Sequence, residues 1–163
     1  MNKRIYVLLI VIAIIVISIF IILRYRGGDS SPQITTEEVL LYFSTKDAMY
    51  LKAETRTVEG ENIYLETAKE LIKGPESSSL NRTIPDEVEV LDMEIEDGTA
   101  VINFNMKLKE NHWGGSTGER MTVYSIVNTL TQFENIDQVK FLLEGEEIDT
   151  LAGHMDLSGP ISR

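Results

Sequence analysis

Hydrophobic residues form one long unbroken run at the start of the chain and shorter periodic segments after it. The run extends from Ile5 to Leu23 and contains no charged residue, and its only polar side chains are those of Tyr6 and Ser18. A run of this length is sufficient for a helix to cross a bilayer. The sequence therefore predicts a transmembrane helix at residues 5–23, after a short cytoplasmic N-terminus at residues 1–4.

The flanks of this run leave its orientation open, because Lys3 and Arg4 precede it and Arg24 and Arg26 follow it. A signal peptide cleaved near Gly28-Asp29-Ser30 is the alternative. It is disfavoured because the apolar core of a secretory signal has only about 7 to 15 residues. The chain has no cysteine, which excludes disulfides and a lipid anchor on a processed cysteine. We therefore expect a single-pass protein of the cell membrane whose C-terminal domain is extracytoplasmic.

The part of the chain that follows begins with a linker at residues 24–36, which is rich in Gly, Ser, Pro and Thr and has no apolar period. Alternation in VLLYF (39–43) and AMYLKAETRTV (48–58) then predicts a hairpin that turns at Thr45-Lys46-Asp47. A helical period covers residues 61–73. Gly74-Pro75 predicts its end, because glycine accepts a left-handed conformation and proline cannot continue the helix.

A second hairpin, a second helix and a third hairpin complete the pattern. Residues 88–95 alternate with a slip near Leu91 that indicates a bulge, and Asp97-Gly98 predicts a tight turn into a strand at residues 100–106. VKFLLEGEEIDTL (139–151) predicts the last hairpin, with its turn at Glu144-Gly145. The order of elements predicts the α+β fold class. Residues 37–163 would form one two-layer domain, with two helices on a mostly antiparallel sheet.

The second helix begins in NHWGGSTGERMTVYSIVNTLTQF (111–133), which has two interpretations. Glycines before a helix N-terminus are typical of anion-binding loops, but the spacings of the known phosphate and dinucleotide loops are absent. A capping box, in which Ser116 and Glu119 bond each other's backbone N–H groups, explains more residues. One side of this helix is then predicted to face the core and the other to face solvent, the solvent side being Thr122, Ser125, Asn128 and Gln132.

Charge narrows the possible partners of the domain. Four of the 15 Lys and Arg residues precede position 27, so residues 27–163 carry 11 basic and 26 acidic side chains, a net charge of −15. Nucleic acid is therefore an unfavourable partner for this region, and anionic lipid headgroups should repel it.

Candidate chemistry is sparse, and the sequence assigns no catalytic, cofactor-binding or metal-binding residue. His112 and His154 lack the spacing of a zinc motif, and no nucleophile elbow is present. A pair of carboxylates such as Glu119 and Asp156 could still converge in three dimensions. Trp113 is a weak candidate for binding: flanked by a histidine and glycines, it is either a plug over the core or an exposed anchor for a partner.

Three stretches resemble the GerMN domain family of bacterial sporulation and spore germination proteins. They are LYFSTKDAMYLKAETRTV, LIKGPESSSLNRTIP and the final block from Gly114, which contains GxxER, NTLTQF, VxFLxxG and GHxD in order. The resemblance covers nearly all of residues 37–163. Two features of this chain depart from the family. The protein that names the family resembles a lipoprotein with two such domains in tandem, whereas this chain is expected to have one domain after an uncleaved helix. INFN (102–105) stands where relatives often have Val-Asp-Phe-Ser.

The resemblance implies a non-enzymatic extracytoplasmic domain that uses no cofactor and acts in the bacterial envelope by protein-protein assembly. Its expected partners are the membrane, through the N-terminal helix, and envelope or sporulation proteins. The alternative is a peptidoglycan-binding module, or an accessory to a peptidoglycan hydrolase, in which Trp113, Tyr42 or Tyr50 would stack on sugar rings.

Overall fold

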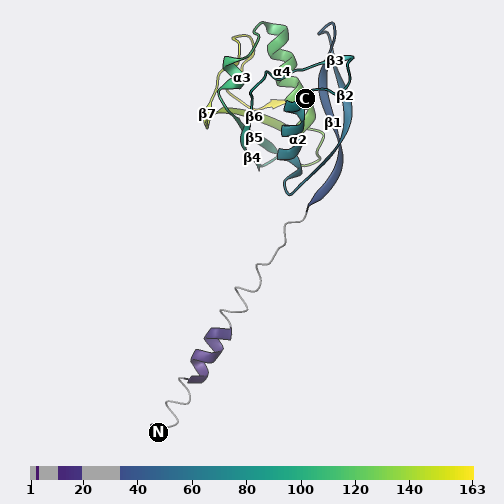
Figure 1. Ribbon diagram of the computed structural model, residues 1–163. Helices are drawn as coiled ribbons and strands as arrows, with labels where there is room; N and C mark the ends of the chain where they lie inside the picture. Colours follow the sequence, from purple (N-terminus) through teal and green to yellow (C-terminus); the bar gives the residue numbers. More distant parts are fainter. Residues whose placement is uncertain (1–2, 4–10, 20–33) are drawn as a thin grey trace. The chain divides into compact units, whose positions relative to one another are not determined.

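The computed structural model of the chain describes residue 3, residues 11–19 and residues 34–163 (Figure 1). Residues 11–19 are helical and lie inside the predicted transmembrane segment. The rest of that segment, most of the predicted cytoplasmic N-terminus and residues 24–33 of the linker lie outside the described residues. Among the residues that are described, no helix is both long enough and apolar enough to span a membrane. Residues 34–163 form a compact unit of their own.

The first hairpin of this unit consists of β1 (Thr35–Thr45) and β2 (Leu51–Gly60), which pair antiparallel. The predicted turn is confirmed, since the N–H of Ala48 donates to the carbonyl of Thr45 at 2.9 Å. A short strand, β3 (Leu80–Asn81), pairs with the end of β1, so the strand order of this sheet is β2-β1-β3.

Helix α2 (Ile63–Lys73) follows the hairpin, as predicted. It begins at Asn62, whose side-chain oxygen accepts from the N–H of Leu65 at 3.1 Å. It ends at Gly74, which has a φ of 90° and donates its N–H to the carbonyl of Leu71. The positive φ agrees with the glycine predicted at this position, although its ψ of 177° differs from that of a left-handed cap.

The second sheet contains β4 (Val90–Glu96) and β5 (Thr99–Phe104), an antiparallel pair joined by the predicted Asp97-Gly98 turn. The register shifts between Val90 and Asp92, which confirms the predicted bulge. The chain then forms α3 (Lys107–Glu110), α4 (Ser116–Leu130) and β6 (Gln138–Leu143). The short strands β7 (Glu146–Glu147) and β8 (Ile161–Ser162) both pair with β6.

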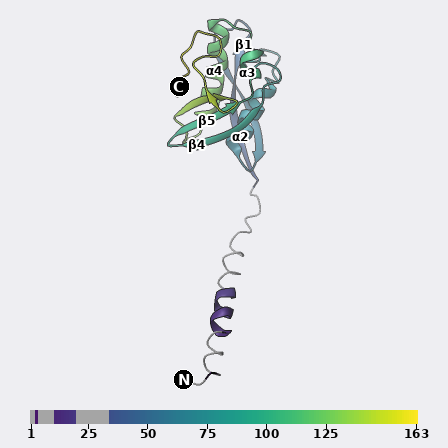
Figure 2. The same ribbon diagram turned by 90° about the vertical axis from the view of Figure 1, so that its left-hand side faces the viewer.

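The prediction of a single sheet with helices on it is wrong, because the strands form two separate sheets. Their pairing is mostly antiparallel, as predicted, and β5 with β6 is the parallel exception. Helix α4 lies between these two strands in the sequence and returns the chain, so that β6 runs in the direction of β5. Helices α2 and α4 contact strands of both sheets, and Figure 1 shows β1 and β2 on one side of them and β4, β5 and β6 on the other. In Figure 2 the side with β4 and β5 faces the viewer.

Helix α4 also covers the free edge of β1. The side-chain oxygen of Gln132, just after the helix, accepts from the N–H of Leu40 at 2.7 Å, and its amide nitrogen donates to the carbonyl of Leu40 at 2.9 Å. Thr129 accepts from the N–H of Tyr42 at 3.2 Å. These side chains satisfy the backbone groups of β1 that would otherwise bond a further strand. The prediction that Gln132 faces solvent is therefore wrong.

The core lies between the helices and the two sheets. Fully buried side chains include Phe43 of β1, Phe104 of β5, Ile126 of α4 and Phe141 of β6. The rings of Phe104 and Phe141 stack at a centroid distance of 6.5 Å across the parallel pair. The alternating positions of β5 and the apolar face of α4 thus pack as their periods predict.

A candidate binding surface along helix α4

Trp113 is exposed, which excludes the first of its two interpretations. Its side chain is 53% accessible, so it does not plug the core. Gly114 and Gly115, with φ of 75° and 77°, turn the chain between Trp113 and α4. A Cβ added at Gly118 would lie 2.8 Å from both Cδ1 and Nε1 of the indole. The indole therefore lies directly over the first turn of α4, at a position where only glycine leaves room for it.

His112 supports Trp113 from the inner side, with the two rings stacked at 5.5 Å and 27°. Nδ1 of His112 accepts from the N–H of Gly114 at 3.0 Å. The hydroxyl of Thr122 lies 3.1 Å from Nε2 and donates to the carbonyl of Thr83 at 2.6 Å. Since that hydroxyl proton is used, Nε2 must be the donor to Thr122, and the imidazole is neutral. Burial lowers the pKa of His112, opposed in part by the charge of Glu119.

The prediction that Thr122 and Ser125 lie on a solvent-facing side of α4 is wrong. Thr122 and Ser125 are fully buried rather than exposed to solvent. Ser125 donates its hydroxyl to the carbonyl of Thr122 at 3.0 Å. Because each hydroxyl has a backbone acceptor, these two polar side chains can be buried on this side of the helix without an unpaired group.

A groove runs between α4 and the β1–β2 turn. Two hollows, with volumes of about 420 and 340 Å³, share Met121 as a lining residue. Trp113 lines the first, and Met49, Tyr50 and Tyr124 line the second. Met49 and Tyr50 are 59% and 68% exposed. We call the surface formed by these five residues the α4 groove.

A third hollow, of about 230 Å³, continues the groove around the N-terminus of α4. It is lined by Ser116, Thr117, Arg120, His154 and Met155. Thr117 also lines the hollow of Trp113, and Arg120 also lines the hollow of Tyr50. The three hollows are therefore adjacent, and one face of α4 forms their common wall.

Glu119 holds the loop at residues 150–154 by hydrogen bonds. The predicted capping box between Ser116 and Glu119 is wrong. The residue before α4 is Gly115, and no side chain caps the helix. Glu119 is fully buried. Its Oε1 accepts from the hydroxyl of Thr150 at 2.6 Å and from the N–H groups of Leu151 and Ala152, each at 2.9 Å. Its Oε2 accepts from the N–H of His154 at 2.8 Å.

The charge on Glu119 is stabilised by these donors. Burial alone would raise the pKa of its carboxyl, but the bonds from Ala152, Thr150, His154 and Leu151 outweigh burial and hold the pKa below its usual value. Asp156, the other member of the carboxylate pair considered above, is exposed and accepts instead from the N–H and hydroxyl of Ser158. No hydrogen bond joins these two acids in the described chain.

Tyr42 and Asn103, also singled out in the sequence, lie outside the groove. Tyr42 accepts a hydrogen bond from Arg163 at 2.7 Å and does not line the groove, whereas Tyr50 does. Asn103 donates to Asp92 at 2.8 Å and accepts from the N–H of Gly145 at 2.8 Å, so it joins the bulge to the β6–β7 turn. Within residues 3, 11–19 and 34–163, no three His, Asp or Glu side chains are grouped to hold a metal ion.

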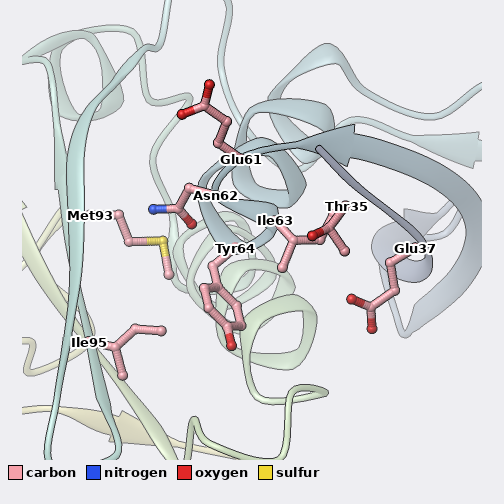
Figure 3. Close-up of a pocket in the computed structure, with 8 residues that line it drawn as sticks. All are labelled: Thr35, Glu37, Glu61, Asn62, Ile63, Tyr64, Met93 and Ile95. Carbon is pink, nitrogen blue, oxygen red and sulfur yellow. The ribbon is translucent and has the colours of Figure 1, made fainter. Parts of the chain in front are cut away.

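A separate cavity of about 600 Å³ opens between the start of α2 and strand β4. Figure 3 shows Met93 and Ile95 of β4 facing Asn62 and Tyr64 across it. Glu37 and Glu61 also line this cavity. The local patterns did not indicate it, because its walls come from parts of the chain about 30 residues apart and meet only in the folded domain.

The fold is that of an α+β domain with two sheets around two helices. The chain belongs to the Germane family, described as "Sporulation and spore germination", whose model matches residues 40–149. This confirms the GerMN resemblance inferred from the motifs. A comparison with curated proteins gives no match.

Three similar solved structures come from Bacillus subtilis and Clostridium perfringens. A tandem of GerMN domains of the sporulation protein GerM from Bacillus subtilis is similar at a TM-score of 0.68 and 26% identity, over 79% of this chain and 47% of that chain. The first GerMN domain of GerM alone gives 0.67 and 25%, over 78% and 98%. A predicted lipoprotein from Clostridium perfringens gives 0.57 and 28%, over 78% and 88%. These relatives are sporulation proteins and a predicted lipoprotein.

Proposed function

We propose that this chain is a membrane-anchored, extracytoplasmic and non-enzymatic domain that acts in sporulation or germination by binding another envelope protein through the α4 groove. The observation that carries the proposal is the exposure of Trp113, Met49 and Tyr50 around two hollows that share Met121. Trp, Tyr and Met are enriched in the centres of protein interfaces, where they lose the most water on binding. Exposed apolar and aromatic side chains grouped in this way are typical of sites that bind another protein.

A binding role also agrees with the use of the polar groups around the groove. Both oxygens of Glu119 accept hydrogen bonds from the chain, and both ring nitrogens of His112 are engaged. A general acid or base needs a free atom directed at a substrate. These two residues instead hold the loops that shape the groove.

The proposed anchor rests on the uncharged run Ile5–Leu23, of which the structure describes a helix at residues 11–19. All of its side chains are apolar except Ser18, whose hydroxyl donates to the carbonyl of Ile14 at 2.7 Å. A polar group satisfied within its own helix can enter a bilayer without an unpaired donor. N-terminal sequencing of protein extracted from membranes tests the anchor. Retention of Ile5–Leu23 supports it, and a new terminus near Ser31 would show that the segment is a cleaved signal peptide.

The binding role is tested by capturing partners with the full chain, cross-linked in native membranes and purified. Trp113→Ala should lose the captured protein. The matched control is Leu91→Ala, which removes a side chain that is 45% exposed on β4, away from the groove. Capture that is unchanged in folded Trp113→Ala would refute the proposed role of the groove.

Peptidoglycan binding is the alternative function, and the exposure of Trp113 and Tyr50 is the observation that favours it. Aromatic faces of this kind also stack on sugar rings. Sedimentation of the domain with purified cell wall separates the two functions. Co-sedimentation that requires Trp113, without any captured protein, would replace the protein-binding proposal.

A further inference from the structure

The charges around the α4 groove are opposite to those of the domain. The described residues that line the three adjacent hollows include Arg82, Arg120 and His154, but no Asp or Glu. Residues 27–163 as a whole carry 26 acidic and 11 basic side chains. The cavity between α2 and β4 has the opposite charge, since the charged residues that line it are Glu37 and Glu61.

Arg120 is the free cation of this surface. It is exposed, it lines two of the three hollows, and it makes no hydrogen bond or ion pair within the described residues. A free guanidinium next to exposed apolar groups presents a planar set of donors that suits a carboxylate.

Arg82 stands at the other end, in the hollow of Trp113. It forms an ion pair with Asp86 and donates to the carbonyl of Ile72 at 2.9 Å. These contacts hold its side chain in place, while the charge of Asp86 offsets part of its own. Arg82 is therefore the weaker of the two cations.

Two acids that lie close to groove residues in the sequence, Glu119 and Asp47, form no ion pair with Arg120 within the described residues. Glu119 is buried and bonded to the loop at residues 150–154. Asp47 accepts from the hydroxyl of Thr45 at 2.6 Å and from the N–H of Met49 at 3.1 Å, and so closes its own turn. The groove therefore combines apolar contact area with a local positive charge.

We propose that the α4 groove binds an acidic peptide segment of a partner protein. An aromatic or aliphatic side chain of that segment enters the hollow between Trp113 and Met121, and a carboxylate pairs with Arg120. This inference rests on the proposed function and specifies the chemistry of the partner. The acidic surface elsewhere repels such a segment, so charge also restricts where and in which orientation it binds.

The test is a selection of random short peptides displayed on phage against immobilised residues 34–163. This unit has its own core and can be tested by itself. The first GerMN domain of GerM has likewise been solved as a separate chain, and the similarity to it covers 98% of that chain. Selected peptides should be enriched in Asp and Glu next to an aromatic or aliphatic residue. Affinity should fall about tenfold or more in Arg120→Glu, because an attraction becomes a repulsion.

A charge-matched control is Lys69→Glu, which makes the same change in net charge at an exposed residue of α2. Its affinity for the selected peptides should stay within about twofold, because Lys69 lines none of the three hollows and salt screens exposed charges that are not in contact. Arg120→Lys keeps the charge without the planar donors and should lie between the native chain and Arg120→Glu. Urea unfolding of each variant shows whether the domain is intact.

The outcomes separate this inference from the function on which it rests. Apolar peptides that require Trp113 but show no acidic enrichment, or equal affinity in Arg120→Glu and Lys69→Glu, overturn the acidic partner and leave the groove as a protein-binding site. Selected peptides that ignore Trp113, together with unchanged capture from membranes in Trp113→Ala, overturn both. Self-association of the purified domain that Arg120→Glu abolishes would assign the groove to a second copy and also overturn the proposal.

Discussion

Glu119→Gln should destabilise the domain substantially although it replaces only one carboxylate oxygen by an amide nitrogen. In the native chain, Oε1 accepts three hydrogen bonds and Oε2 accepts one, from the N–H of His154. The amide oxygen of glutamine can keep the three bonds at the Oε1 position, without the negative charge. The amide nitrogen then faces the N–H of His154, donor against donor.

The expected cost follows from these four bonds. Hydrogen bonds to charged acceptors contribute about 1.5 to 3 kcal/mol each, against about 1 kcal/mol for neutral ones, and a stranded buried donor costs about 1 to 3 kcal/mol. Relief of the desolvation of the charge offsets part of this loss. We expect the free energy of unfolding near neutral pH to fall by about 2 to 4 kcal/mol. Urea unfolding of residues 34–163 measures it.

The pH dependence gives a second measurement with a fixed sign. The pKa of Glu119 is lower in the folded chain than in the unfolded chain, so its contribution is present above the unfolded value, about 4.3, and is lost as the pH falls through the lower folded value. The difference in stability between native chain and variant should therefore shrink in acid.

Glu59→Gln is the matched control, because the side chain of Glu59 is exposed and accepts no hydrogen bond from the described residues. Its effect should stay within about 0.5 kcal/mol. A loss below about 0.5 kcal/mol in Glu119→Gln, or a difference that does not change with pH, would contradict a stabilised buried carboxylate.

Three further predictions concern the groove and the sheet edge. Gly118→Ala should weaken binding of the phage-selected peptides, because the new Cβ displaces the indole of Trp113. The free energy of unfolding should change by less than about 1 kcal/mol, because alanine favours the helix. Unchanged affinity would contradict the placement of the indole. The native chain should lose stability in urea melts as the pH falls below about 6.5, because the folded chain keeps His112 neutral with a lowered pKa, and His112→Gln should lack this loss. Gln132→Ala should speed hydrogen exchange at the amide of Leu40 and cost about 1 kcal/mol, whereas protection that survives would mean that another group covers this edge.

Elements set by local chemistry could be predicted from the sequence. Gly74-Pro75, Asp97-Gly98 and the slip near Leu91 act on their own backbone, and the structure places a helix end, a turn and a bulge there. The alternation in β5 likewise placed Ala100, Ile102 and Phe104 in the core. Signals of this kind depend on neighbours in the sequence, so one chain is sufficient to interpret them.

Polar residues with distant partners could not be placed in this way. Glu119 has the spacing of a capping box, but its donors lie more than 30 residues later in the chain. Gln132 looked like a solvent-facing residue, but its partner, Leu40, is 92 positions away. A polar side chain is buried when a remote backbone group satisfies it, and no local period carries that information. Likewise, the exposure of Trp113 depends on how the turn at Gly114 and Gly115 lies on α4.

The position of Trp113 provides an intrinsic fluorescent probe of the α4 groove. The chain has one tryptophan, and its indole lies at the α4 groove, half in water and stacked on His112. Its emission therefore reports on this surface alone, without a contribution from any other indole. A ligand that covers the ring should shift the emission to shorter wavelength, whereas unfolding should shift it to longer wavelength. Opposite shifts would let a single titration distinguish occupancy from denaturation without any attached label.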